Sequence, residues 1–128
     1  MSNTMYIARS LDESLFEKAE SGGAVSSILK CALKTKQVDG VVTVRTKTKG
    51  DRFSGIPVLI TNPDDLNDTA GSLHCSVPNI VRFLKEYLDG GFSKKLVVVG
   101  KPCDIRAIIE LQKRYQTEID DIILVGVN

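Results

Sequence analysis

The sequence predicts an α/β fold, with a mixed, largely parallel sheet flanked by helices in a single domain that spans residues 1–128. Three patterns support this fold class. Apolar residues recur with helical spacing near the start of the chain, β-branched runs follow in the middle, and the last third alternates apolar strand, helix and apolar strand. Because parallel strands are joined by right-handed crossovers, this last unit predicts a parallel pair within a domain of two or three layers.

The first half of the chain is expected to contain one long helix and an antiparallel pair of strands. Residues 5–10 are partly apolar and predict an edge strand, and residues 11–20 predict a loose helical turn. From residue 23 to 36 the apolar side chains are spaced to form one face of a helix. These side chains are Val25, Ile28, Leu29, Ala32 and Leu33. The β-branched run 40–45 and the run 56–61 are predicted to form a hairpin.

The second half is expected to alternate helices with strands. Residues 62–65, Asn-Pro-Asp-Asp, have the cap, proline and acidic first turn that start a helix, and Gly71 is predicted to end it. Asn79 is predicted to cap the next helix. The continuous apolar run 95–100 is typical of a strand buried on both faces. A further helix then leads to the last apolar strand, at 122–127.

The bulk composition is that of a globular domain without the signature of a nucleic-acid or membrane protein. The 128 residues are 42% apolar and 26% charged, and the net charge of +1 leaves no electrostatic footprint for nucleic acid or an anionic membrane. No apolar run approaches the roughly 20 residues that span a bilayer, and the N-terminus lacks a signal-peptide pattern. Three cysteines without paired spacing argue against a disulfide framework, so we expect a cytoplasmic protein.

A pair of glycines at the start of the first helix is the first candidate binding site. The stretch consists of Ser21, Gly22, Gly23, Ala24, Val25 and Ser26. Glycine allows a positive φ and leaves the main chain uncovered by a Cβ, so free N–H groups at the positive end of the helix could bind an anion or the polar edge of a ring. The alternative is a tight turn that only directs the helix. The stretch lacks the spacing of known dinucleotide and phosphate glycine loops.

Residues 71–79 form a second candidate loop, which contains the single histidine, His74, beside Cys75. Small polar residues in an irregular loop can follow the contour of a ligand. The alternative is a helix cap at Gly71 followed by a plain connection, with His74 on the surface. A neighbouring Cys and His do not form a nucleophile by themselves, because they must meet in space with a third orienting group.

Cys103, at the start of the predicted fourth helix, is the candidate metal ligand. A helix N-terminus and the nearby Lys101 would favour its thiolate, the form that binds metals and clusters. The alternative is a cysteine that packs as a small apolar group. Cys31 is expected in the core. Because no Cys-x-x-Cys or His-x-x-His occurs, a complete metal site within this chain is not expected.

Three stretches together resemble the N-terminal domain of the beta subunits of the hydrogenase and formate dehydrogenase that use coenzyme F420, which is 8-hydroxy-5-deazaflavin. The stretches are Ser-Gly-Gly-Ala-Val-Ser at 21–26, Ala-Gly-Ser-Leu-His-Cys at 70–75 with Pro78-Asn79 following, and Lys-Pro-Cys-Asp at 101–104. The resemblance covers nearly the whole chain, with the motifs in the family's order. The last two stretches look most like the formate dehydrogenase branch.

The resemblance implies a flavin-binding electron-transfer domain. In this family the beta subunit binds FAD and one 4Fe–4S cluster and passes a hydride between FAD and coenzyme F420, coupled to formate or hydrogen oxidation in a partner alpha subunit. The flavin site would then contain the first two loops with Asn79 and Lys101. The implied residues are Ser21, Gly22, Gly23, Ala24, Val25, Ser26, Gly71, Ser72, Leu73, His74, Asn79 and Lys101.

The same resemblance implies that Cys103 is one of four cluster ligands. The family's next cysteine would follow almost immediately after Asn128, so we expect a truncated beta subunit without the cluster-binding C-terminal part. Residues 71–74 read Gly-Ser-Leu-His where many relatives have Gly-Thr/Ser-Lys-Tyr, so a lysine contact with the cofactor would be lost. Two further hypotheses stay open, a non-catalytic domain that docks on a partner subunit and a thiol enzyme that uses Cys103.

Overall fold

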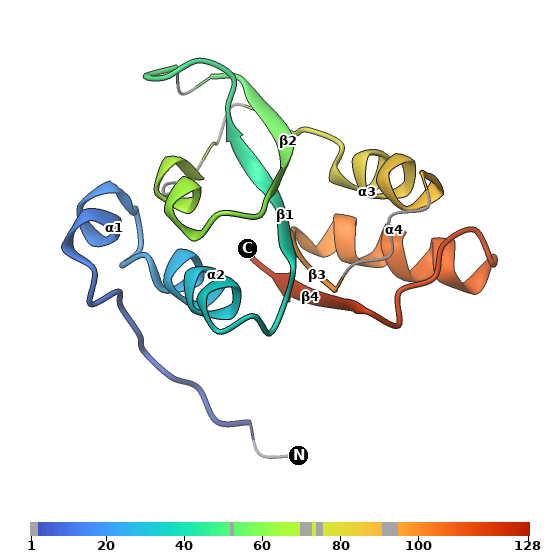
Figure 1. Ribbon diagram of the computed structural model, residues 1–128, viewed down its shortest axis with the longest axis horizontal. Coiled ribbons are helices and arrows are strands. Elements are labelled where there is room, and N and C mark those ends of the chain that lie inside the picture. The colour runs from blue at the N-terminus through green and yellow to red at the C-terminus, as the bar shows by residue number, and fades with distance from the viewer. Residues whose placement is uncertain (1–2, 52, 70–72, 74–75, 91–94) are drawn as a thin grey trace.

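A four-stranded mixed sheet forms the centre of the fold (Figure 1). The computed structural model describes residues 3–51, 53–69, 73, 76–90 and 95–128. The strands are β1 (Gly40–Thr46), β2 (Gly55–Ile60), β3 (Leu96–Gly100) and β4 (Ile122–Gly126), in the spatial order β2-β1-β3-β4. β1 is antiparallel to β2 and parallel to β3, and β3 is parallel to β4. The predicted mixed, largely parallel sheet is therefore confirmed.

The two edge strands differ from the central strands in burial. β3 lies between β1 and β4, and all its residues are buried, as its continuous apolar run predicts. β2 is at one edge, where Pro57, which has no N–H to donate, can pair with Val44 without breaking a central ladder. β4 forms the other edge, so its apolar residues are only partly covered, and Ile123 is 47% exposed.

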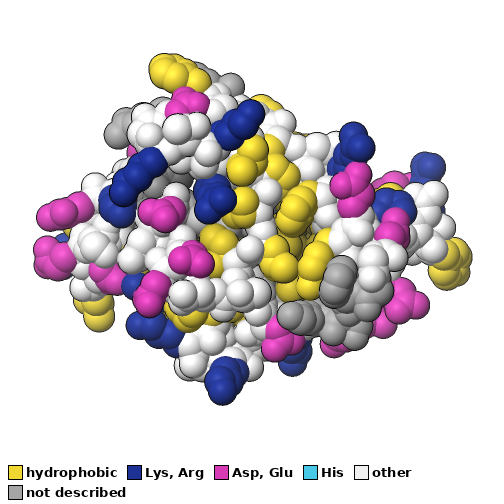
Figure 2. Space-filling model, turned by 45° about the horizontal axis from the view of Figure 1, so that its top comes forward, with side chains coloured by type: hydrophobic (Ala, Val, Ile, Leu, Met, Phe, Trp, Pro, Cys, Tyr) yellow, Lys and Arg dark blue, Asp and Glu magenta, His cyan; other side chains and the backbone are white. Residues whose placement is uncertain are grey.

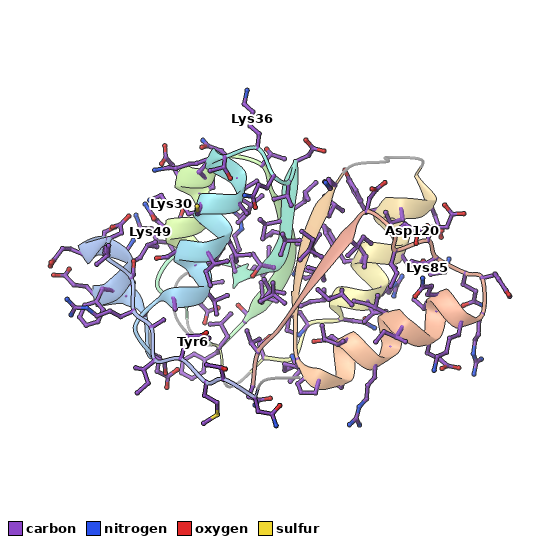
Figure 3. The ribbon with its side chains drawn as sticks, turned by 90° about the horizontal axis from the view of Figure 1, so that it is seen from below. Tyr6, Lys30, Lys36, Lys49, Lys85 and Asp120 are labelled. Carbon is purple, nitrogen blue, oxygen red and sulfur yellow. The ribbon has the colours of Figure 1, made fainter. Side chains whose placement is uncertain are left out.

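Helices cover both faces of the sheet and give the domain three layers (Figures 1 and 3). The helix α2 (Ala24–Lys34) and the 3-10 helix η1 (Pro63–Thr69) pack on one face. The helices α3 (Ile80–Asp89) and α4 (Pro102–Lys113) pack on the other face. Among the described residues, no helix is both long and apolar enough to cross a membrane.

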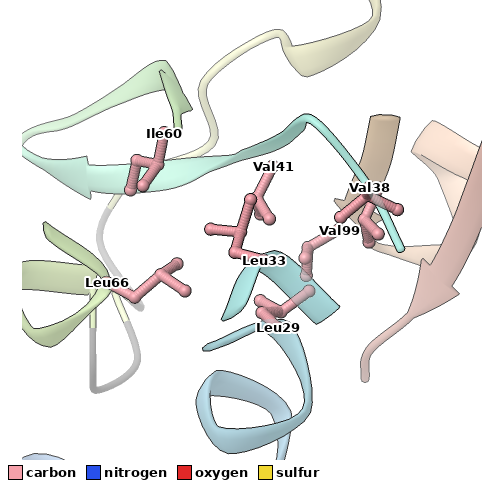
Figure 4. Packing of buried hydrophobic residues seen from close by; sticks show 8 residues of the cluster. Leu29, Leu33, Val38, Val41, Ile60, Leu66 and Val99 are labelled. Carbon is pink, nitrogen blue, oxygen red and sulfur yellow. The ribbon is translucent and has the colours of Figure 1, made fainter. Parts of the chain in front are cut away.

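One hydrophobic cluster fills the space on each side of the sheet, because successive strand residues point to opposite faces. The cluster on the α2 side joins Leu29 and Leu33 of α2 to Leu66 of η1 and to strand residues (Figure 4). Its other buried members are Val38, Val41, Ile60, Val97 and Val99. The cluster on the α3 and α4 side contains Val42, Ile80, Leu84, Leu96, Val98 and Ile108. The two clusters give the sheet an apolar support on each face.

Three sequence-based predictions were wrong in detail. Residues 5–10 are not a strand, and they extend away from the sheet without a sheet partner among the described residues (Figure 1). Cys31 is exposed rather than in the core, because α2 buries only the side that carries Leu29 and Leu33, and Ile28 is itself 63% exposed. The short segment after Asn62 is a 3-10 helix, η1, in which Leu66 is the buried anchor.

The face shown in Figure 2 carries charged side chains of both signs, interspersed around a band of hydrophobic side chains across its middle. A mixed surface of this kind does not create a large single-sign field. Contiguous hydrophobic surface is, in contrast, typical of places where another molecule packs.

The short helix α1 (Glu13–Lys18) forms within the predicted turn 11–20 and is tied to the rest of the fold through its cap, Asp12. Oδ1 of Asp12 accepts hydrogen bonds from the main-chain N–H of Ser14 at 3.1 Å and from its hydroxyl at 2.7 Å. Oδ2 lies 2.9 Å from Nζ of Lys30 on α2. The Ser14 side chain, and then Lys30, hold the pKa of Asp12 well below its usual range.

This lowered pKa predicts an acid-sensitive contribution to stability. Because the folded pKa of Asp12 is depressed, its contribution is present above the ordinary aspartate pKa of about 4 and is lost progressively as the pH falls below it. We expect Asp12→Asn to lower the urea midpoint at pH 7 and to have a much smaller effect near pH 2. A difference between the two proteins that stays constant with pH would contradict this assignment.

Candidate functional site

A cavity of about 450 Å³ lies between the start of α2 and the carboxyl ends of the parallel strands. Its volume falls within the roughly 300–1,000 Å³ that small-molecule sites usually enclose. Its walls include Thr43 and Val44 of β1, Val99 and Gly100 at the end of β3, and Val127 just after β4. In α/β sheets, ligands bind beyond the carboxyl ends of the strands, so the position matches the location of a binding site in this fold class.

The three loops that the sequence analysis selects converge on this cavity. The glycine loop contributes Ser21, Gly23, Ala24, Val25 and Ser26, the second loop contributes Leu73, Ser76 and Pro78, and the third contributes Lys101. These stretches are separated by tens of residues in the sequence, and the sheet topology brings them to one end of the fold. Because each loop lies next to a different helix or strand, no single motif predicts that the three loops border the same cavity.

The main-chain amides at the start of α2 are available to a ligand. The cap residue Gly23 gives no side-chain hydrogen bond, and the first main-chain bond of the helix runs from the N–H of Ser27 to the carbonyl of Gly23, at 3.1 Å. Within the described part of the chain, the N–H groups of Ala24, Val25 and Ser26 have no acceptor. Free first-turn amides carry the positive end of the helix dipole, which favours an anion or a carbonyl oxygen.

Packing by itself already requires the two glycines. Gly22 and Gly23 have φ of 81° and 70°, in the left-handed region. A Cβ on Gly23 would lie 3.0 Å from the carbonyl oxygen of Leu15, and one on Gly22 would lie 3.3 Å from Cβ of Arg9. Gly22 is not among the residues that line the cavity. The turn that directs the helix therefore explains the glycine pair, and the free amides beyond it are a separate feature.

The start of α4 places a cation and a carboxylate together at the cavity wall. The main-chain N–H of Lys101 donates to Oδ2 of Asp104 at 2.9 Å, and Nζ of Lys101 lies 3.8 Å from the same oxygen. Asp104 is only 8% exposed, whereas the Lys101 side chain is 37% exposed. The sequence analysis missed Asp104 as a site residue. The sequence did contain a signal for Asp104, because an acidic residue at the fourth position of Lys-Pro-Cys-Asp is typical of a helix capping box.

Two further polar residues at the cavity, one on a strand and one in the second candidate loop, were not named individually by sequence reasoning. Thr43 of β1 is buried on the α2 side of the sheet and lines the cavity. Ser76 lines it as well, and its Oγ accepts a hydrogen bond of 2.9 Å from the N–H of Gly55. The hydroxyl of Thr43 in the otherwise apolar run 40–44 was the available signal, because a buried polar residue in a strand needs a partner.

Several predicted site residues are not brought to the cavity by the described structure. Gly71, Ser72 and His74 lie outside the described residues. Asn79 does not line the cavity, and its Oδ1 accepts a hydrogen bond of 2.9 Å from the N–H of Arg82, which confirms it as the cap of α3. The binding roles assigned to these residues stay predictions.

Cys103 lies in the first turn of α4, is exposed and is not part of the cavity wall. The described residues contain no group of three or more His, Cys, Asp or Glu side chains placed to hold a metal ion. Cys31, the other described cysteine, is on α2 and is also exposed. A four-ligand cluster therefore does not fit the described part of this chain, and Cys103 could supply one thiolate at most.

The chain is similar in sequence to two curated proteins that are longer than it is. The chain is 43% identical over 129 aligned residues to "F420-dependent formate dehydrogenase 1 subunit beta" of Methanococcus maripaludis, which covers 100% of this chain and 32% of the relative. It is 40% identical over 122 residues to the corresponding subunit of Methanocaldococcus jannaschii, which covers 95% and 31%. The chain thus spans about a third of the length of these curated relatives.

A solved structure shares the fold. A chain of the F420-reducing NiFe hydrogenase complex from Methanosarcina barkeri superposes with a TM-score of 0.75 at 23% identity, over 92% of this chain and 41% of that chain. Residues 5–84 match the family model described as "Coenzyme F420 hydrogenase/dehydrogenase, beta subunit N-term". Together with the identity to the formate dehydrogenase subunits, this match shows that the chain belongs to the family of coenzyme F420 hydrogenase/dehydrogenase beta subunits, N-terminal region.

Proposed function

We propose that this chain is the flavin-binding part of an oxidoreductase beta subunit, in which a hydride passes between FAD and coenzyme F420, coupled to formate or hydrogen oxidation. The relatives that support the reaction class are formate dehydrogenase subunits named as F420-dependent. The observation that carries the proposal is the convergence of the three loops on one cavity at the carboxyl ends of the parallel strands. Such a position suits a planar cofactor that needs both apolar walls and a few fixed polar groups.

The residues present fit a flavin. Leu29, Val44 and Val99 give the cavity apolar walls, against which a ring system can pack. The free amides of the first turn of α2 would favour the pyrophosphate, and the ammonium group of Lys101 would favour a carbonyl oxygen at the pyrimidine edge of the ring. A flavin in this cavity would supply the hydride chemistry through N5, with C5 of the deazaflavin as the other centre. The protein would supply position and electrostatic field.

The remaining cofactor and partner assignments belong to the same proposal. Cys103 would give one thiolate to a 4Fe–4S cluster, with the other ligands in polypeptide that the longer relatives contain and this chain does not span. We derive no electron-transfer step through such a cluster, because the described residues do not form it. The partner would be the alpha subunit of a formate dehydrogenase or hydrogenase, and the location would be the cytoplasm.

The test is a titration of the 128-residue chain with FAD, followed by quenching of flavin fluorescence. We expect saturable binding, and we expect Lys101→Met to weaken it about threefold to tenfold, since a half-exposed charge contact is worth little more. Lys49→Met is the control, because Lys49 is an exposed residue of the β1–β2 turn outside the cavity (Figure 3). Absence of saturable binding by the folded chain would refute the proposal.

A second candidate function, docking on a partner subunit without catalysis, is favoured by the exposed N-terminal arm. Met5, Tyr6, Ile7 and Leu11 are each more than four-fifths exposed, and Tyr6 is labelled beside this arm in Figure 3. Apolar side chains gathered on one exposed segment are typical of an interaction surface. Replacement of Ile7 and Leu11 by serine would distinguish the two functions, since it should weaken subunit association and leave FAD binding unchanged.

A further inference from the structure

Asp104 presents a nearly buried carboxylate at the cavity wall. The side chain is 10% exposed, and Asp104 lines the cavity next to Lys101. Oδ2 accepts the hydrogen bond from the N–H of Lys101 and lies 3.8 Å from its Nζ. Oδ1 has no hydrogen-bond partner among the described residues. A carboxylate has about four acceptor sites, so Asp104 can still accept a hydrogen bond from a molecule in the cavity.

The local structure fixes where this carboxylate lies. Its cap bond holds the side chain back against the start of α4, and the main-chain bond from Ile105 N–H to Lys101 carbonyl, at 3.0 Å, continues the helix. Gly100 leaves room for it, since a Cβ at Gly100 would lie 3.0 Å from Cβ of Asp104. The carboxylate is therefore held in place at the end of β3.

Lys101 and Asp104 thus offer a hydrogen-bond donor and an acceptor side by side. A phosphate would be attracted by Lys101 and repelled by Asp104, so this pair is a poor anion site. A ring edge in which a carbonyl oxygen lies next to an N–H matches it, because the carbonyl would accept from Lys101 and the N–H would donate to Asp104. An oxidised flavin ring has this edge at C2=O and N3–H, and a deazaflavin has the same pattern.

We infer that Lys101 and Asp104 together bind the cyclic imide edge of the flavin ring, with Asp104 accepting the ring N3–H. The inference rests on the proposed function and deepens it, since it orients the ring with its pyrimidine edge toward the start of α4. The pyrophosphate is then left to the free amides of α2 on the other side of the cavity. Asp104 is a specificity-determining residue in this arrangement, because it selects rings that carry an imide N–H over rings that do not.

The test compares FAD with FAD methylated at N3, using equilibrium titration by flavin fluorescence. The natural chain should bind the methylated cofactor about tenfold or more weakly, since a hydrogen bond to a charged acceptor is lost. Asp104→Asn keeps an oxygen that can cap Lys101 N–H and places an amide N–H₂ toward the ring. In that variant FAD binding should fall about tenfold or more, and the penalty for methylation should nearly disappear.

Asp120→Asn is the matched control, because Asp120 is exposed and lies just before β4, at the opposite end of that strand from the cavity (Figure 3). It makes the same chemical change and should alter neither affinity. Thermal melts of both variants confirm that they are folded before affinities are compared. If the natural chain binds FAD and N3-methyl FAD equally well, or if Asp104→Asn keeps the full penalty, the inference is overturned while the proposed function stands. If neither flavin binds, the proposed function itself fails.

Discussion

Gly23→Ala is expected to destabilise the fold by about 2–4 kcal/mol, from left-handed backbone strain together with overpacking. Gly23 has a φ of 70°, and its new Cβ would lie 3.0 Å from the carbonyl oxygen of Leu15 and 3.2 Å from Cβ of Ala19. The oxygen belongs to the main chain of α1 and cannot give way as a flexible side chain would. Urea unfolding followed by circular dichroism measures the loss.

Gly50→Ala separates the two causes. Gly50 has a φ of 87° but nothing within 4 Å of the position of its Cβ, so only the strain of about 1–2 kcal/mol applies. Equal losses at the two positions would show that the contact with Leu15 does not matter. If Gly23→Ala costs more stability than Gly50→Ala, glycine substitutions in the loop 21–26 disturb the packing of the fold. Substitutions of Lys101 and Asp104 then give the cleaner test of binding.

Ile108→Ala is expected to cost about 2–5 kcal/mol, the usual range for removing a buried branched side chain. Ile108 is completely buried where α4 packs against β3 and β4, together with Leu84 of α3. The same helix carries Asp104 at its start, so the cavity wall depends on this packing. The measurement is the free energy of unfolding from urea titration, with the slope compared to that of the natural chain.

Two variants calibrate this result. Ile108→Val removes one methylene from the same site and should cost about 0.5–1.5 kcal/mol. Ile109→Ala, at the next position of α4 with 37% exposure, should cost clearly less than Ile108→Ala. A loss at Ile109 equal to that at Ile108 would mean that α4 packs on the sheet through a different face.

Most of the fold could be predicted because its patterns are local. The hairpin of β1 and β2, the parallel pair of β3 and β4, and the cap of α3 by Asn79 each depend on residues close in sequence. The predictions that failed depended on tertiary context. The spacing of apolar residues in α2 does not show how much of the helix surface is buried against the sheet. Cys31 was therefore predicted in the core, although it is exposed.

The site could be predicted in part for the same reason. Motifs marked the loops at 21–26 and 101–104, but only the sheet order shows that both border one cavity. Thr43 was not selected because its strand position carries no motif, and its polar role appears only when the face of β1 is known. Asp104 lies within a quoted motif, yet its burial at the cavity wall could not be read from the sequence. The ligand role that the resemblance implies for the glycines stays a prediction, because packing alone already requires both of them.

The most direct test of the account is the amide NMR spectrum of the chain during addition of FAD. If the cavity is the flavin site, the largest shifts will fall on Ala24, Val25 and Ser26 at the start of α2 and on Gly100 and Lys101 at the end of β3. Amides at the far ends of the strands, such as that of Asp120, will move little. Shifts confined to residues outside this set, with the start of α2 unmoved, would contradict the assignment.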